Sequence, residues 1–174
     1  MKTANTLWMG APASTIYRLA AEVERWPEIL PHYRWVTVLE REGNRKLVEM
    51  AATRDGFPVK WQALQVLEPD APRIRFTHVR GVTKGMEVEW SFHEQDGGTL
   101  VRIDHALDLA WPIVGPWVAE HIIGPQFVAN IAGKTLRYIK VLSEQSATTE
   151  ERRTSHTLRD EPAHYGTPSA GAQL

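Results

Sequence analysis

Residues 124–144 read GPQFVANIAGKTLRYIKVLSE and predict one long amphipathic helix. Pro125 suits the first turn of such a helix, because the N–H group that proline lacks would have no partner there. At roughly 1.5 Å per residue the helix is about 30 Å long, enough to cross a small domain. Its apolar side chains gather on one side when successive residues are spaced by about 100°. The members of this face are Phe127, Val128, Ile131, Ala132, Thr135, Leu136, Tyr138, Ile139 and Leu142.

An apolar helix face of this kind needs a partner, and most of the chain before it has the pattern of strands. We therefore expect the face to pack against a sheet. Thr135 is the polar residue at the centre of the face. Its hydroxyl group is expected to bond back to a carbonyl of its own helix, with contact to a ligand as the alternative.

The composition is that of a soluble globular protein. Of the 174 residues, 43% are hydrophobic and 24% are charged, which fits one domain with a tail. No apolar run approaches the roughly 18 residues that a membrane helix needs, and the first residues lack the apolar core of a secretory signal. We therefore expect a cytoplasmic protein. The chain has no cysteine, which excludes a disulfide, a thiol nucleophile and a zinc-thiolate site.

The charge of the chain argues against a nucleic-acid partner. The formal net charge is -1, the isoelectric point is near 6.7, and basic residues form no run longer than a pair such as Arg152-Arg153. No nucleotide-binding glycine pattern and no metal-ligand spacing occurs, so the sequence predicts neither a cofactor nor a metal. It leaves the oligomeric state open. The seven tryptophans either fill the core or offer flat faces to a ligand.

The chain before the helix predicts an α+β fold dominated by one antiparallel sheet. Residues 3–10 form a first strand, residues 13–24 a helix, and residues 26–31 (WPEILP) a short helical corner between two prolines. Turn-forming residues then separate six strand-like runs that follow one another as hairpins. These runs are residues 35–41, 45–54, 57–67, 73–80, 85–94 and 99–109.

The domain is expected to span residues 1–145. Residues 146–174 are small and polar, with scattered apolar residues and no period. They cannot bury enough surface to offset the entropy cost of ordering them. We therefore predict a disordered C-terminal tail.

Alternation predicts which strand residues face the helix, because residues i and i+2 lie on the same side of a strand. Residues 57–67 fit two registers, and the one with Val59, Trp61 and Ala63 inside is preferred to the one with Lys60, Gln62, Leu64 and Val66 inside. Elsewhere the inner rows are clearer, and two of them run from apolar residues into a histidine. These rows are Val48, Met50, Ala52 and Arg54; Ile74, Phe76, His78 and Arg80; Met86, Val88, Trp90 and Phe92; and Val101, Ile103, His105, Leu107 and Leu109.

Three polar side chains thus fall together on the predicted inner face. Counting from the turns, His78 and His105 lie on either side of Val88, roughly 10 Å apart, with Arg80 one step nearer the rim. An unpaired buried polar group costs about 1–3 kcal/mol. These side chains therefore line a cavity, the favoured interpretation, or they are satisfied core histidines and an arginine that reaches out to solvent.

A set of structural residues spread over residues 3–143 carries a family resemblance. They are Ala11-Pro12-Ala13, Ile16-Tyr17, residues 26–31, residues 36–39, Trp61, Pro72-Arg73-Ile74, Gly81, Trp90-Ser91-Phe92 and residues 98–101. With them, the sequence resembles the bacterial polyketide cyclase/dehydrase and coenzyme Q-binding START-like proteins (the SRPBCC or Bet v 1-like superfamily). The element order also matches their helix-grip fold, a curved antiparallel seven-stranded sheet wrapped around a long C-terminal helix.

The resemblance implies an apolar tunnel between sheet and helix that holds a lipid, a quinone, a polyketide or another aromatic compound. Some members cyclise and dehydrate polyketide chains, whereas others carry ligands, and no catalytic motif is common to all. Three functions remain open: ligand binding, which we favour; an aromatase/cyclase-dehydratase; and a ligand-free interaction domain.

The candidate site residues follow from the inner rows and the helix face. If the protein is catalytic, Arg80 would hold a developing oxyanion, and His78 or His105 would carry the proton. The candidate ligand-binding residues are Arg54, Trp61, Phe76, Met86, Val88, Trp90, Ile131, Thr135 and Ile139.

Overall fold

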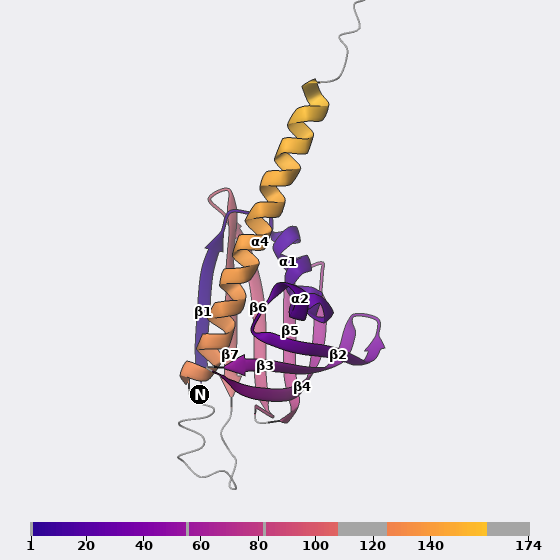
Figure 1. The fold of residues 1–174 in the computed structure, drawn as a ribbon, viewed down its shortest axis with the longest axis vertical. Helices are drawn as coiled ribbons and strands as arrows, with labels where there is room; N and C mark the ends of the chain where they lie inside the picture. Colours follow the sequence, from indigo (N-terminus) through magenta and orange to yellow (C-terminus); the bar gives the residue numbers. More distant parts are fainter. Residues whose placement is uncertain (1, 55, 82, 108–124, 160–174) are drawn as a thin grey trace, which may run out of the picture.

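The computed structural model describes residues 2–54, 56–81, 83–107 and 125–159. Seven antiparallel strands form one sheet in the order β1-β7-β6-β5-β4-β3-β2, and a long helix, α4, lies across it (Figure 1). This is the α+β helix-grip architecture that the sequence predicts. The strands are β1 (Lys2–Met9), β2 (Tyr33–Glu42), β3 (Arg45–Arg54), β4 (Phe57–Glu68), β5 (Arg73–Gly81), β6 (Met86–Gln95) and β7 (Gly98–Leu107). The helices are α1 (Ala13–Ala21), the short 3-10 turn η1 (Val23–Arg25), α2 (Trp26–Ile29) and α4 (Pro125–Arg159).

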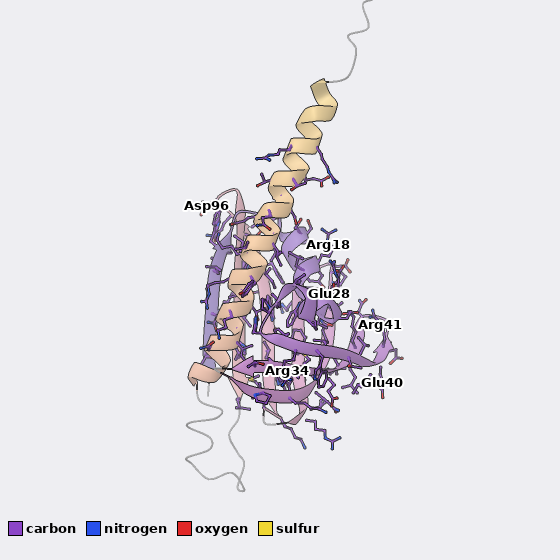
Figure 2. All side chains as sticks on the ribbon, in the orientation of Figure 1. Arg18, Glu28, Arg34, Glu40, Arg41 and Asp96 are labelled. Atoms are coloured by element: carbon purple, nitrogen blue, oxygen red, sulfur yellow. The ribbon has the colours of Figure 1, made fainter. Side chains whose placement is uncertain are left out.

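The strand bounds agree with the alternation and the turn residues to within a few positions. The preferred register of β4 is confirmed, because Trp61 and Ala63 are buried while Lys60 is exposed. Charged side chains lie mostly on the outside, as Figure 2 shows for the exposed residues Arg18, Glu28, Arg34, Glu40, Arg41 and Asp96. Within the described residues, no helix is long and apolar enough to cross a membrane.

Helix α4 buries one face against the sheet and α1, but the face is rotated from the predicted one. Ala132, Leu136 and Ile139 are buried as expected, whereas Tyr138 is 43% exposed. Tyr138 precedes Ile139 by one residue, which turns it about 100° away from the centre of the contact. Ser143, which the sequence places outside this face, is fully buried. The side chains of Phe127 and Val128 lie outside the described part of the structure.

The C-terminal end of α4 differs from the prediction of a tail that is disordered from residue 146. The helix continues to Arg159 and projects past the sheet (Figure 1). Residues 134–159 contain neither glycine nor proline, so nothing in them interrupts the backbone hydrogen bonds of a helix. The rest of the predicted tail, residues 160–174, lies outside the described residues.

Polar contacts tie α4 to the edge strand β1. The Glu144 carboxylate accepts a hydrogen bond of 2.7 Å from the Gly10 N–H, and Lys140 Nζ donates to the Trp8 carbonyl at 3.0 Å. Lys140 and Glu144 also form an ion pair with each other. These contacts hold one side of the helix on β1 and fix its height along the strand.

We expect the buried face of α4 to supply a large share of the stability. Ile139→Ala removes a fully buried side chain and should lower the free energy of unfolding by about 2 to 5 kcal/mol. Val141→Ala is the matched control, because Val141 lies two residues away and is 52% exposed; its effect should stay within about 0.5 kcal/mol. Urea unfolding of both variants checks this, and equal losses would contradict the observed orientation of the helix.

Candidate functional site

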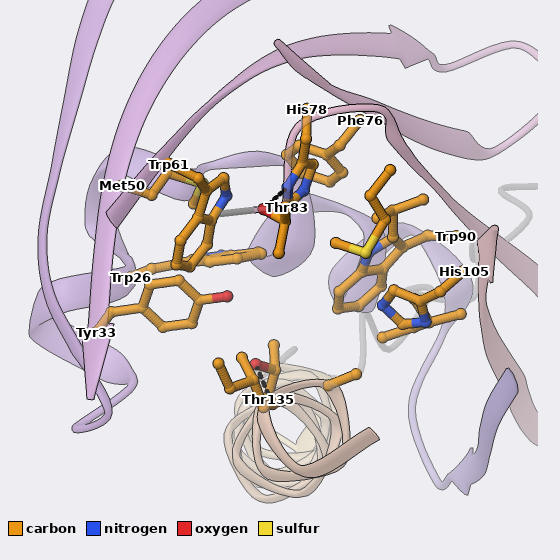
Figure 3. Close-up of a pocket in the computed structure, with 15 residues that line it drawn as sticks. Trp26, Tyr33, Met50, Trp61, Phe76, His78, Thr83, Trp90, His105 and Thr135 are labelled. Atoms are coloured by element: carbon orange, nitrogen blue, oxygen red, sulfur yellow. Dashed lines mark hydrogen bonds between the residues drawn. The ribbon is translucent and has the colours of Figure 1, made fainter. Parts of the chain in front are cut away.

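A cavity lies between the concave face of the sheet and α4 (Figure 3). Its volume is about 580 Å³ counting the opening, of which about 70 Å³ is reachable by the centre of a water molecule. Most of its walls are apolar, and none of the described lining residues is an aspartate, glutamate, lysine or arginine. The lining residues are Trp26, Tyr33, Met50, Trp61, Phe76, His78, Thr83, Met86, Val88, Trp90, Ile103, His105, Ile131, Ala132 and Thr135.

Aromatic rings form much of the wall. Trp26 stands at its centre, with ring centroids 4.8 Å from Tyr33, 6.2 Å from Trp90 and 6.3 Å from Phe76. The indole N–H of Trp26 donates to the carbonyl of Leu19 on α1 at 3.0 Å, which fixes the orientation of the ring. Such a wall suits a flat apolar molecule, because rings bury large areas and contact other rings face to edge or offset.

Most of the predicted ligand-binding residues line this cavity. Seven of them do so: Trp61, Phe76, Met86, Val88, Trp90, Ile131 and Thr135. Ile139 does not; it is fully buried in the hydrophobic core, because it lies on the part of α4 that packs directly against its neighbours. The side chain of Arg54 lies outside the described part of the structure.

Six of the residues that line the cavity were not among the predicted site residues. Met50 and Ile103 belong to inner rows that alternation had identified, and Ala132 to the apolar face of α4, so a signal for these three existed. Trp26, Tyr33 and Thr83 come from a helical corner, the irregular start of β2 and the β5–β6 hairpin loop. Period-two alternation carries no information in such segments.

His78 is held in the wall by two neighbours. Its Nδ1 atom lies 2.6 Å from Thr83 Oγ1, and its ring stacks on Trp61 with centroids 5.8 Å apart and planes at 5°. Burial lowers the pKa of His78 to about 3, with a further contribution from the neighbouring His105. The predicted pairing of His78 with Val88 is wrong, because Phe76 occupies that position.

His105 lies opposite Val88, as predicted, and is 7% exposed. Burial lowers its pKa to about 4, and the negative charge of Asp104 partly offsets this effect. Its Nδ1 atom is buried and has no hydrogen-bond partner in the described part of the chain. Both cavity histidines are therefore neutral imidazoles at pH 7.

Arg80 does not share the inner face with His78, and that prediction is wrong. On β4, Ala63 pairs with His78 and the adjacent Gln62 pairs with Arg80, so Val79 is an extra residue that forms a β-bulge. A bulge of one residue reverses the alternation. Arg80 is therefore exposed on the outer face, where its charge helps to lower the pKa of Glu49.

Thr135 on α4 makes two hydrogen bonds, of which the sequence predicted one. Its hydroxyl donates to the Ile131 carbonyl at 2.9 Å, as expected. His32 Nε2, 2.9 Å from the same oxygen, must therefore be the protonated ring nitrogen and donate to it. Burial and the charges of Lys134 and Arg137 lower the pKa of His32 to about 4.

The hydroxyl group of Tyr33 points from β2 into the cavity, toward Thr135 (Figure 3). Burial raises the pKa of Tyr33 above its usual value, so the phenol stays protonated at pH 7. No group of three or more metal-ligating side chains occurs among the described residues. Hydroxyl, imidazole and indole N–H groups, all of them neutral, are thus the polar side-chain functions of the described cavity lining.

The neutral histidines predict a pH dependence of stability. His78 titrates near 6.5 when unfolded and near 3 when folded, so between these values the unfolded chain binds more protons. The free energy of unfolding should therefore fall as the pH drops below 6.5, by up to about 1.4 kcal/mol per pH unit for one such histidine. His78→Gln should make this slope shallower in urea unfolding between pH 6.5 and 5. His93→Gln, on the exposed face of β6, controls for loss of an imidazole, and an unchanged slope in His78→Gln would contradict the burial of a neutral ring.

Comparison with known proteins places this chain in a family. The profile of the polyketide cyclase/dehydrase and lipid transport family matches residues 9–121. The actinorhodin polyketide synthase bifunctional cyclase/dehydratase of Streptomyces coelicolor is 28% identical over 152 residues, which cover 86% of this chain and 46% of that protein. The chain thus spans less than half the length of this relative.

Solved structures show the same fold at low sequence identity. The Zhui aromatase/cyclase from Streptomyces sp. R1128 superposes with a TM-score of 0.71 at 18% identity, covering 83% of this chain and 94% of that one. A START superfamily protein from Mycobacterium smegmatis superposes with a TM-score of 0.60 at 18% identity, covering 85% and 97%. The chain belongs to the polyketide cyclase/dehydrase and lipid transport family.

Proposed function

We propose that this chain binds a neutral, largely aromatic small molecule of the polyketide type in the cavity between the sheet and α4. The observation that carries the proposal is the lining itself, in which aromatic and aliphatic walls surround a few neutral polar groups. Ligand sites in proteins have this composition. The family supports a ligand of this class, since one matching relative is named a polyketide synthase cyclase/dehydratase and one structural neighbour an aromatase/cyclase.

The charge of the cavity narrows the class of ligand. His78 and His105 are neutral at pH 7, and no cationic side chain is among the described lining residues. A carboxylate buried there would lose its hydration without gaining an ion pair, at a cost of several kcal/mol. A quinone or a neutral polyketide aromatic therefore suits the cavity better than a free fatty acid.

Filling the cavity from the helix side should abolish binding. Ala132 lines the cavity and is 6% exposed, so Ala132→Leu places extra atoms in the ligand space. We expect menadione, a neutral naphthoquinone, to quench the tryptophan fluorescence of the wild type and to bind at least tenfold more weakly to Ala132→Leu. Val141→Leu, on the exposed side of α4, is the control and should bind like the wild type.

Circular dichroism and urea unfolding of each variant separate a blocked cavity from a misfolded chain. Equal affinity in Ala132→Leu, with the fold intact, would show that menadione binds elsewhere. No quenching in any form, at saturating menadione, would support the alternative of an interaction domain that takes no ligand.

A second function, aromatase/cyclase-dehydratase activity, is favoured by the position of the two histidines in the cavity wall. A neutral imidazole accepts a proton from carbon or oxygen without first losing one, and His105 Nδ1 has no protein partner in the described part of the chain. With Arg80 on the outer face, stabilisation of an enolate would fall to hydrogen-bond donors such as the Tyr33 hydroxyl.

The catalytic proposal predicts different outcomes for inner and outer residues. On a model poly-keto substrate, His105→Gln and His78→Gln should each lower kcat by roughly 100-fold or more, as loss of a general base does, while menadione affinity changes little. Arg80→Ala should retain turnover, because its side chain is exposed on the other face of the sheet. Turnover that survives both histidine changes would leave ligand binding as the function of the cavity.

A further inference from the structure

A further set of polar groups lies around His105, one of the residues that line the cavity. Thr3 on β1 is the direct partner of His105 on β7. Along β1 the side chains of Thr3, Asn5 and Leu7 are partly buried and alternate with exposed ones, so Thr3 and His105 share the side of the sheet that faces α4. Thr3 Oγ1 and His105 Nδ1 are both buried and lack a hydrogen-bond partner among the described residues.

Helix α4 adds a group at the same height. The helix runs alongside β1 in the same direction, since Lys140 bonds to the Trp8 carbonyl and Gly133 lies against the Asn5 side chain. A helix advances about 1.5 Å per residue and a strand about 3.3 Å. Asn130 lies three residues before Gly133, about 4.5 Å back along the helix, and therefore at a height between Asn5 and Thr3 on β1. Asn130 Oδ1 is also buried without a partner in the described part of the structure.

Three elements thus each present a buried polar atom that no described protein group satisfies. Buried polar atoms in proteins nearly always have a partner, so unpartnered atoms on a cavity-lining histidine and on elements packed beside it indicate a place for a polar group of the ligand. His105 is nine-tenths buried and lines the cavity, so it is the member of this set that borders the ligand space.

The chemistry of the three groups selects a hydroxyl. The Asn130 amide oxygen accepts only, while the Thr3 hydroxyl and the neutral His105 ring can each accept or donate. A hydroxyl both donates and accepts, so it can satisfy an acceptor and a donor at once, whereas a carbonyl offers acceptor atoms alone. None of the three groups is a cation that would pair with a carboxylate.

We propose that Thr3, His105 and Asn130 form a polar subsite that binds a hydroxyl group at one end of a neutral aromatic ligand. The subsite rests on the proposed function, because it orients a molecule held by the aromatic walls. It would set the direction in which an elongated ligand enters, with its hydroxyl end toward β1 and its apolar body among Trp61 and Trp90.

The test compares two probes of similar size, 2-naphthol and 2-methoxynaphthalene. The first carries a hydroxyl group, and the second has a methyl group in place of the hydroxyl hydrogen, so it cannot donate a hydrogen bond. At pH 7, tryptophan fluorescence titration of the full chain should show 2-naphthol binding at least tenfold more tightly. Thr3→Val and Asn130→Leu should each reduce this preference to about threefold or less and leave the affinity for 2-methoxynaphthalene unchanged. Thr6→Val is the matched control, since Thr6 lies on the exposed side of the same strand, and it should keep the full preference.

The possible results separate the subsite from the function on which it rests. Equal affinities of the two probes for the wild type would overturn the subsite while leaving ligand binding in place. A preference that persists in both Thr3→Val and Asn130→Leu would also overturn it, because the hydroxyl would then bind elsewhere. Failure of both probes to bind would contradict the proposed function itself, and the subsite with it.

Discussion

The contact between α4 and the concave face of the sheet is the constraint on which the rest of the structure depends. Leu136 and Ile139 are buried in this contact, and Glu144 and Lys140 tie the same helix to β1. Because α4 is held on that edge, Ile131 and Thr135 on its other flank face the cavity instead of filling it. The cavity is thus a consequence of where the helix is anchored.

The ionisable groups in the described cavity lining are buried and uncharged, and this determines which ligands suit the cavity. Every described ionisable group in its lining is a histidine or tyrosine whose pKa burial moves away from the charged form. The site therefore offers hydrogen bonds and neutral imidazoles in place of ion pairs. This electrostatic character suits neutral aromatic molecules, and the described lining groups that could transfer a proton are uncharged.

Much of the fold and part of the site could be predicted because both depend on regular periodicity. Alternation placed His105 opposite Val88 and put Trp61, Phe76 and Trp90 on the inner face, since a strand keeps its pleat over many residues. It failed for Arg80 because the bulge at Val79 inserts one residue without a signal in the hydrophobic pattern. Trp26 and Tyr33 were not predicted as site residues, because tertiary packing and not a local period orients side chains in a helical corner and at an irregular strand start.

The central claim is that an aromatic ligand occupies the space between the sheet and α4. Co-crystallisation with 2-bromonaphthalene, followed by location of bromine from its anomalous scattering, tests it directly. The account predicts a bromine site among the lining residues, in contact with the rings of Trp61 and Trp90 or the side chain of Ile131. Bromine found only outside the cavity, such as in the groove between Arg18, Asp96 and Ser146, would contradict the account.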